Sequence, residues 1–278
     1  MDITRTSSPR RCELIAYFVL TFAFSWAIEV PLALAARGVG SIRVPPTLHY
    51  LASFGPLFAA VVLTLASEGP PGIGRLFKGL TRWRVPAVYW LFSVAAPTVV
   101  FVGIVLLTRL WQGSWPALRT LGVVDYLGDV GVLPALLLWL LTFGLGEETG
   151  WRGFALPRLL AGRSAFSASM ILGAFWALWH LPAIFYRDTY IQIGLLVIPM
   201  LLTVAVVGSV VYTWLYNGTG GSLLLLVLFH GLFDFYSVWD GGVIGPGMVM
   251  TILLVFWAVR VYNVYGCENL ALELKVTH

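Results

Sequence analysis

The chain has 278 residues, of which 59% are hydrophobic and only 11% are charged, and its mean hydropathy is +0.88. This composition excludes an ordinary soluble globular domain and predicts a polytopic membrane protein. The formal net charge of +4 comes largely from loops beside apolar segments, so membrane orientation explains it and nucleic-acid binding is not expected. Cys12 and Cys267 lie near opposite ends, without a CxxC or Cys/His cluster, so neither a disulfide framework nor a structural zinc site is expected.

The first half of the chain carries three apolar segments that are predicted to be spans, at residues 14–36, 47–66 and 87–107. The first is too long for the apolar region of a signal peptide, so a retained helix is expected. Its carboxylate, Glu29, is expected near the headgroups. The loop 68–86 is rich in Gly, Pro and basic residues, and as a short helix it would be amphipathic and suited to an anionic membrane surface.

The second half carries five further predicted spans, which begin near Val130 and continue at residues 165–186, 191–216, 223–238 and 248–264. The fourth span is expected to end at a pair of glutamates, with residues 149–163 returning through or along the interface. Residues 217–221 predict a tight turn, and Ser222 is placed to cap the next helix.

These spans predict one domain, residues 1–278, that folds as an all-α bundle of about eight transmembrane helices around an intramembrane polar site. With eight spans, most of the 17 Lys and Arg residues fall on the side of the two termini. The positive-inside rule therefore predicts a multi-pass protein of the cell membrane with both termini in the cytoplasm.

Two adjacent carboxylates, Glu147 and Glu148, close the charge-free run from Val132 to Phe143. Ionisable groups at the edge of hydrocarbon are costly, so their default interpretation is functional. On a helix Arg152 lies four residues after Glu148, which favours an ion pair between these two. Glu147 then points roughly 100° away and is left for chemistry. The alternative is a structural charge cluster at the end of a helix.

Small residues accompany the carboxylates. Gly146 and Gly150, with Gly153 one turn further on, form a small-xxx-small strip. Such a strip predicts that another helix approaches closely here.

Two histidines, His180 and His230, fall inside predicted spans. Trp176 lies one turn before His180 and is expected to fix the imidazole by stacking. Pro182 has no N–H, which frees the carbonyl of Leu178 to hold a water or a ring N–H. A lone buried histidine is often structural, but two of them beside a glutamate pair indicate a site. His49 and His278 receive no role.

Asp234 lies four residues after His230, on the same helical face, and can orient the imidazole or join it in binding. Together with Glu147 and His180, this set suggests a reaction with water, in which a carboxylate takes a proton and imidazoles hold the water or stabilise an oxyanion. The same set could instead bind zinc through His180, His230 and Glu147. The HExxH signature of helical zinc proteases is absent.

Three ordered motifs on separate spans carry a family resemblance: Glu147-Glu148-xxx-Arg152, Trp176-xxx-His180 and His230-xxx-Asp234. They resemble the CPBP family of intramembrane proteases, which comprises CAAX prenyl endopeptidases and bacteriocin-processing or immunity-related proteins. The resemblance is firmest over residues 132–236. It implies a membrane endopeptidase, glutamate- or metal-dependent, that acts on a peptide or protein substrate of the prenylated CAAX type. A non-catalytic immunity protein and an ion-coupled transporter are the alternatives, and zinc is the candidate cofactor.

The resemblance also implies roles for the motif residues. Glu147 would activate water together with His180, Glu148 and Arg152 would support it, and His230 with the residue at position 234 would stabilise the oxyanion. The family usually has Phe where Trp176 stands, and Asn where Asp234 stands. Because an ionised Asp cannot donate to an oxyanion, Asp234 is either protonated or serves His230 or a metal.

The predicted spans place His180 and His230 at different depths in the membrane, although both belong to one site. Counted from Arg163, His180 lies about 25 Å along its helix, whereas His230 lies about 13 Å past Gly221. Both must reach Glu147. Either the fifth helix begins outside the hydrocarbon, or Glu147 lies deeper than the predicted end of its span.

Overall fold

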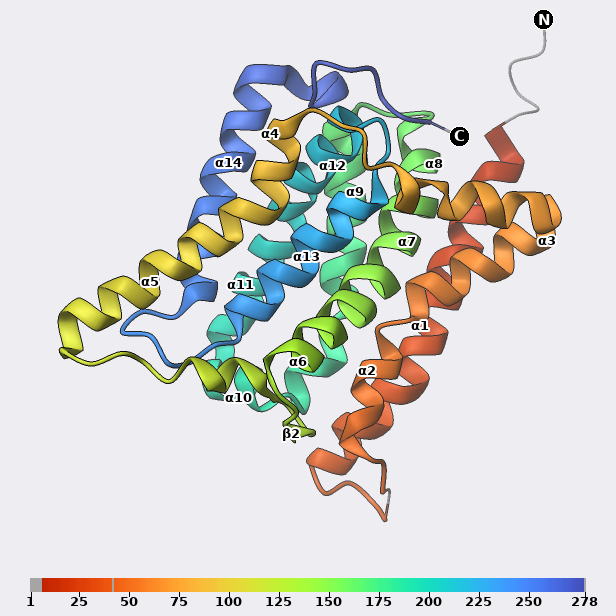
Figure 1. Cartoon of the computed structure of the whole chain (residues 1–278). Helices are drawn as coiled ribbons and strands as arrows, with labels where there is room; N and C mark the ends of the chain where they lie inside the picture. The colour runs from red at the N-terminus through yellow and green to blue at the C-terminus, as the bar shows by residue number, and fades with distance from the viewer. Residues whose placement is uncertain (1–6, 42, 278) are drawn as a thin grey trace, which may run out of the picture.

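The computed structural model describes residues 7–41 and 43–277 (Figure 1). The longer helices are α1 (Ser7–Ala36), α3 (Gly55–Phe77), α5 (Ala96–Gln112), α9 (Ala165–Trp179), α12 (Gly208–Gly218), α13 (Leu223–Ser237) and α14 (Pro246–Asn269). The shorter ones are α2 (His49–Ala52), α4 (Ala87–Trp90), α6 (Val132–Trp139), α7 (Glu148–Gly150), α8 (Leu156–Leu160), α10 (Asp188–Ile193) and α11 (Val197–Leu202). Strands β1 (Val123–Val124) and β2 (Gly128–Asp129) form a small antiparallel ladder.

Within residues 7–41 and 43–277, the helices join into seven continuous segments that are long and apolar enough to cross a membrane. They are Arg11–Ala36, Pro46–Thr81, Ala87–Gln112, Val132–Leu160, Ala165–Phe185, Asp188–Gly218 and Pro246–Asn269. The remaining predicted span corresponds to α13, which has 15 residues and is therefore about 22 Å long, against a hydrocarbon thickness of about 30 Å. The predicted class, an all-α polytopic membrane protein, is confirmed.

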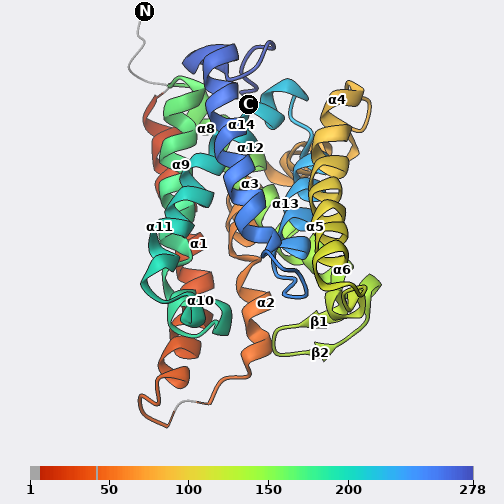
Figure 2. The ribbon, with the colours of Figure 1, turned by 90° about the vertical axis from the view of Figure 1, so that its left-hand side faces the viewer.

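The centre of the bundle is formed by α13 and the segment Val132–Leu160. In Figure 1 these lie between α5 on one side and α1 with α3 on the other. Figure 2 shows α4 and α5 at the edge opposite α8, α9 and α11. The beginning of α1 and the end of α14 lie at the same end of the bundle (Figure 1), as expected from the eight spans that the sequence predicts.

The segment Val132–Leu160 runs through the glutamate pair without ending. The prediction that residues 149–163 return along the interface is therefore wrong, because the helix continues to Leu160. Two π-helical segments, Leu140–Glu147 and Trp151–Ala155, lie within it. Glu147 is thus near the middle of a long helix, which resolves the difference in predicted depth in favour of a deep carboxylate.

The predicted loop 68–86 is helical in its first half, which agrees with the interpretation of this stretch as a short helix and not with a loop. The helix α3 continues to Phe77 and is followed by a 3-10 segment, Lys78–Thr81. Gly69, whose φ is 66°, kinks α3 just before two prolines. Only a glycine adopts this left-handed conformation readily, so the kink redirects the helix rather than ending it.

The turn and the cap before α13 are confirmed. After α12 ends at Gly218, a turn leads to Ser222, whose Oγ accepts a hydrogen bond from the backbone N–H of Leu225 at 3.4 Å.

The predicted close approach at the glycine strip is also confirmed. A Cβ added to Gly150 would lie 2.3 Å from the carbonyl carbon of Pro56, and one added to Gly146 would lie 3.1 Å from the carbonyl oxygen of Ser53. The beginning of α3 therefore packs directly on the backbone beside the glutamate pair. Gly153 faces Leu223 of α13 instead.

Candidate active site

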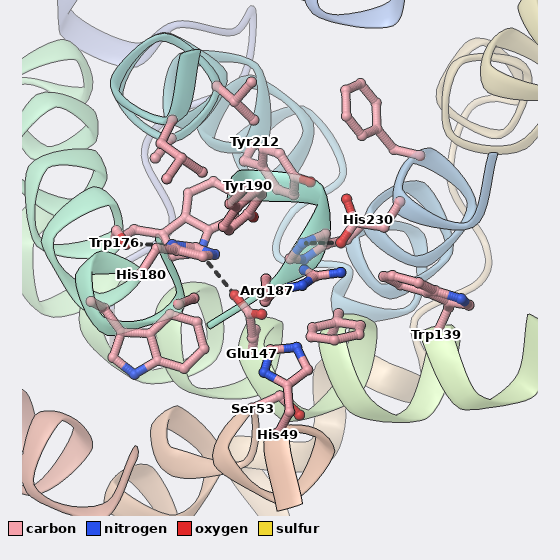
Figure 3. A pocket seen from close by; sticks show the side chains of 18 of the residues that line it. His49, Ser53, Trp139, Glu147, Trp176, His180, Arg187, Tyr190, Tyr212 and His230 are labelled. Atoms are coloured by element: carbon pink, nitrogen blue, oxygen red, sulfur yellow. Dashed lines mark hydrogen bonds and ion pairs between the residues drawn. The ribbon is translucent and has the colours of Figure 1, made fainter. Parts of the chain in front are cut away.

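The predicted site residues meet at one cavity of about 100 Å³ (Figure 3). Glu147, His180, His230 and Asp234 all line it. They come from the segment Val132–Leu160, from the end of α9 and from α13, so the three motifs converge as their order predicted. Glu148 and Arg152 do not line the cavity and lie behind its wall.

Glu148 and Arg152 form the predicted ion pair. Glu148 Oε1 lies 2.7 Å from Arg152 Nη1, and both side chains are fully buried. The guanidinium lies over the rings of Trp176 and Tyr212, 4.5 and 4.1 Å from their centroids. The same Glu148 oxygen lies 2.8 Å from His230 Nδ1. This buried pair therefore links α7 to α9, α12 and α13, and removing either charge would leave the other uncompensated.

Glu147 faces the other way, into the cavity. Its side chain is buried, and Oε2 accepts a hydrogen bond of 2.8 Å from the indole N–H of Trp176 (Figure 3). The expected stacking of Trp176 on His180 is wrong, because their ring centroids are 5.9 Å apart and the planes are inclined by 55°. A buried indole N–H needs an acceptor, and here it finds the glutamate.

His180 stands where α9 ends. Its Nδ1 lies 2.8 Å from the carbonyl oxygen of Trp176, not from that of Leu178 as expected. The reason is that Pro182 belongs to a 3-10 segment, Leu181–Phe185, so the imidazole folds back onto the last turn of α9. A carbonyl oxygen only accepts, so Nδ1 carries the proton. In the neutral ring Nε2 is then free to accept one.

His230 lies between two carboxylates. Its Nδ1 faces Glu148, and its Nε2 lies 3.3 Å from Asp234 Oδ2. The Asp234 side chain is 28% exposed, whereas that of His230 is buried. Asp234 is thus placed to orient His230 and is itself accessible from the cavity.

The arrangement does not fit the zinc alternative. Among the residues that the structure describes, no three His, Cys, Asp or Glu side chains are grouped so that they could hold a metal ion. Both nitrogens of His230 face carboxylates, and one nitrogen of His180 is bound to a carbonyl. His180, His230 and Glu147 therefore share the cavity wall without forming a ligand set.

A second polar cluster on the cavity wall was not predicted. Glu29 is only 3% exposed, so its expected position at the headgroups is wrong. The hydroxyl of Tyr186 donates to Glu29 Oε1 at 3.1 Å and lies 2.6 Å from Nδ1 of His49. Glu29 Oε2 and His49 Nε2 are buried and have no hydrogen-bond partner among the residues that the structure describes. In the sequence, the position of Glu29 inside an apolar run could have indicated that it belongs to the site. No feature of the sequence indicated this for His49.

Arg187 completes this cluster. It follows the 3-10 segment after His180, lines the same cavity and is 8% exposed. Its Nη2 donates to Asp125 Oδ2 at 3.1 Å, and the guanidinium lies 5.1 Å from the ring centroid of Tyr190. In the sequence Arg187 resembles any basic residue at the end of a span, so its inward position could not be predicted.

Comparison with known proteins bears on the motif-bearing region. Residues 129–236 match a family model described as type II CAAX prenyl endopeptidase Rce1-like. The chain is also 33% identical over 176 residues to a Methanococcus maripaludis protein named CAAX prenyl protease 2. That alignment covers 58% of this chain and 59% of the length of the relative. The resemblance seen in the three motifs is therefore confirmed, and the part of the chain that is similar to the Rce1-like CAAX prenyl endopeptidases is residues 129–236.

Proposed function

We propose that the protein is an intramembrane endopeptidase that hydrolyses a peptide bond of a membrane-associated substrate. The observation that carries this proposal is the position of Glu147, which lies on the wall of a buried cavity together with His180 and His230. The similarity of residues 129–236 to the CAAX prenyl endopeptidases supports the same conclusion.

Glu147 and His180 are the proposed water-activating groups. A water between them would give one proton to the Glu147 carboxylate, while its position is held by Nε2 of His180. The oxygen of the water bonds to the carbonyl carbon of the substrate, and the C–N bond breaks as Glu147 passes the proton to the departing amine. The indole N–H of Trp176 fixes the carboxylate without neutralising it.

His230 is the proposed donor to the oxyanion. With a proton on both ring nitrogens, His230 donates from Nδ1 to Glu148 and from Nε2 toward Asp234 and the cavity. A developing oxyanion can share the Nε2 proton because Asp234 is the more exposed of the two carboxylates. Asp234 then acts by orienting the imidazole, which is one of the three roles left open by its replacement of the usual Asn.

A prenyl chain on the substrate has a place beside this cavity. An apolar cavity of about 330 Å³ lies among α5, α13 and α14 and shares Phe229, Phe233 and Leu254 with the polar one. Its lining is apolar except for Arg260. We propose that an isoprenoid attached near the scissile bond lies there, since burial of each methylene contributes about 0.8 kcal/mol.

The test is cleavage of quenched fluorescent peptides of CAAX type by the purified protein, with and without the prenyl group. We expect cleavage that resists chelators, prefers the prenylated peptide and disappears in Glu147→Gln. Glu273→Gln, at an exposed glutamate, is the matched control and keeps activity. Absence of cleavage by the intact protein would favour a non-catalytic scaffold, and loss with chelator that zinc restores would favour a metalloprotease.

A further inference from the structure

The guanidinium of Arg187 is incompletely satisfied although the residue is only 8% exposed. One nitrogen, Nη2, pairs with Asp125, and the ring of Tyr190 lies against the group. Its Nε is buried and has no hydrogen-bond partner in the described part of the chain. An unpaired N–H of a buried charged group is costly, so a ligand that accepts from it would be bound favourably.

The charges around the cavity favour an anion at this point. Glu29, Glu147 and Asp234 line the cavity, and among its described lining residues Arg187 is the only Lys or Arg. An anion that enters is repelled by the carboxylates and finds a permanent positive charge in one place. Asp125, which already contacts Arg187, is not part of the lining, and its side chain is 39% exposed. Asp125 therefore fixes one edge of the guanidinium and leaves the remaining edge available.

The charge of the site selects the kind of anion. A single guanidinium matches the single charge and the two oxygens of a carboxylate, whereas a phosphate brings nearly two charges into a cavity that already contains three acids. The end of a peptide chain supplies an anion of this kind, whereas the backbone of a chain that continues carries no charge. A chain that ends here must bring its charged terminus out of water, which is costly without a partner.

Resting on the proposed peptidase function, we propose that Arg187 binds the free C-terminal carboxylate of the substrate. Arg187 is then a specificity-determining residue. It holds the end of the chain at a fixed place relative to Glu147, so the position of cleavage is counted from the carboxyl terminus. The enzyme thereby distinguishes a chain end from an internal segment of the same sequence.

The experiment compares two peptides of one sequence, one with a free C-terminal carboxylate and one with a C-terminal amide. For the unmodified protein we expect kcat/KM to be about tenfold or more higher for the acid, because a hydrogen-bonded charge pair is lost in the amide. Arg187→Gln should lower kcat/KM for the acid and leave the amide nearly unchanged, so that the preference disappears. Arg187→Lys should restore part of it, because the charge remains without the bidentate geometry.

Asp125→Asn is the matched control, because it removes the observed partner of Arg187 but not the guanidinium. It should keep the preference for the acid. Equal cleavage of both peptides by the unmodified protein overturns the proposal, as does an Arg187→Gln variant that loses activity on both equally, since that indicates a structural role. If Asp125→Asn loses the preference for the acid, the preference depends on the ion pair between Arg187 and Asp125. That result also overturns the proposal.

A binding measurement separates this proposal from the proposed function. A fluorescently labelled acid peptide should bind Glu147→Gln protein about tenfold or more tightly than its amide, without any catalysis. If the intact protein cleaves neither peptide, the proposed function fails, and this binding ratio still decides the role of Arg187. Equal binding of acid and amide overturns that role.

Discussion

Glu147 and Glu148 are neighbours with the same chemistry and opposite surroundings. Glu147 ends a π-helical segment and turns its carboxylate into the cavity, where a single indole N–H holds it. Glu148 begins α7 and is bound behind the wall by Arg152 and His230. π-helical turns occur often at functional sites because they reorient one side chain relative to the next.

This difference predicts two distinct failures. Glu147→Gln should lower kcat/KM at least about a hundredfold and leave the melting temperature nearly unchanged, because a general base is lost but no ion pair. Glu148→Gln should lower the melting temperature markedly, since leaving Arg152 unpaired costs about 3–5 kcal/mol. Both are measured in detergent by peptide cleavage and thermal unfolding. Equal loss of activity at equal stability would contradict this division of roles.

Asp234 offers a second prediction. In Asp234→Asn the side-chain carbonyl can still accept from His230 Nε2, and the amide can donate to an oxyanion. We therefore expect kcat/KM to be kept or raised in Asp234→Asn, measured by peptide cleavage at neutral pH. Asp234→Ala should lose most activity because His230 is no longer oriented. An inactive Asn variant would show that the charge of Asp234 is required.

The sequence predicted those site residues whose partners lie on the same helix or in a known motif order. The pair of Glu148 with Arg152 follows from a spacing of four, and His230 with Asp234 follows from the same spacing. Glu29, His49 and Arg187 meet only because α1, α2 and the segment after α9 close over one cavity. No local periodicity carries that information, so this cluster could not be predicted.

Among the elements, the segment Val132–Leu160 shows where local reasoning failed. The predicted end at the glutamate pair assumed that charges mark the edge of the hydrocarbon. Here Glu148 is paired with Arg152 and Glu147 accepts a hydrogen bond from Trp176 inside the bundle, so the helix continues. The existence of the apolar helices was predictable from hydropathy, whereas their ends depended on tertiary partners.

The contact of this segment with α3 gives a third prediction. Gly150→Ala should destabilise the protein by about 1–3 kcal/mol, because its Cβ would overlap the backbone of Pro56. Gly103→Ala is the control, since a Cβ there meets no atom within 4 Å and Gly103 lies inside α5. Thermal unfolding of both variants in detergent checks this. Equal stability of the two would mean that α3 can shift away from Gly150.

At the scale of the whole molecule, the beginning of α1 and the end of α14 share one end of the bundle (Figure 1). Arg75, Lys78, Arg82 and Arg84 follow the kink of α3, on the side of the termini by the order of the spans. Arg5 and the side chain of Arg10, which also entered the predicted charge asymmetry, lie outside the described residues. We propose that this end faces the cytoplasm.

Cysteine labelling tests this orientation as a fourth prediction. Cys12 and Cys267 are free and exposed, so both are first replaced. In intact cells a single cysteine at exposed Asp240 should react with an impermeant reagent, and one at exposed Lys78 should react only after the membrane is opened. The reverse pattern would invert the proposed topology.

The central position of Glu147 also sets a minimum reach for any substrate. Thirteen residues separate it from Leu160, which is about 20 Å of helix at 1.5 Å per residue. An extended chain covers that distance with about six residues. A protein that approaches along the bundle axis must therefore present an unfolded tail of roughly that length beyond its last folded residue. Shortening such a tail residue by residue should stop cleavage abruptly rather than gradually. The depth of the Glu147 carboxylate therefore sets the minimum length of tail that can be cleaved.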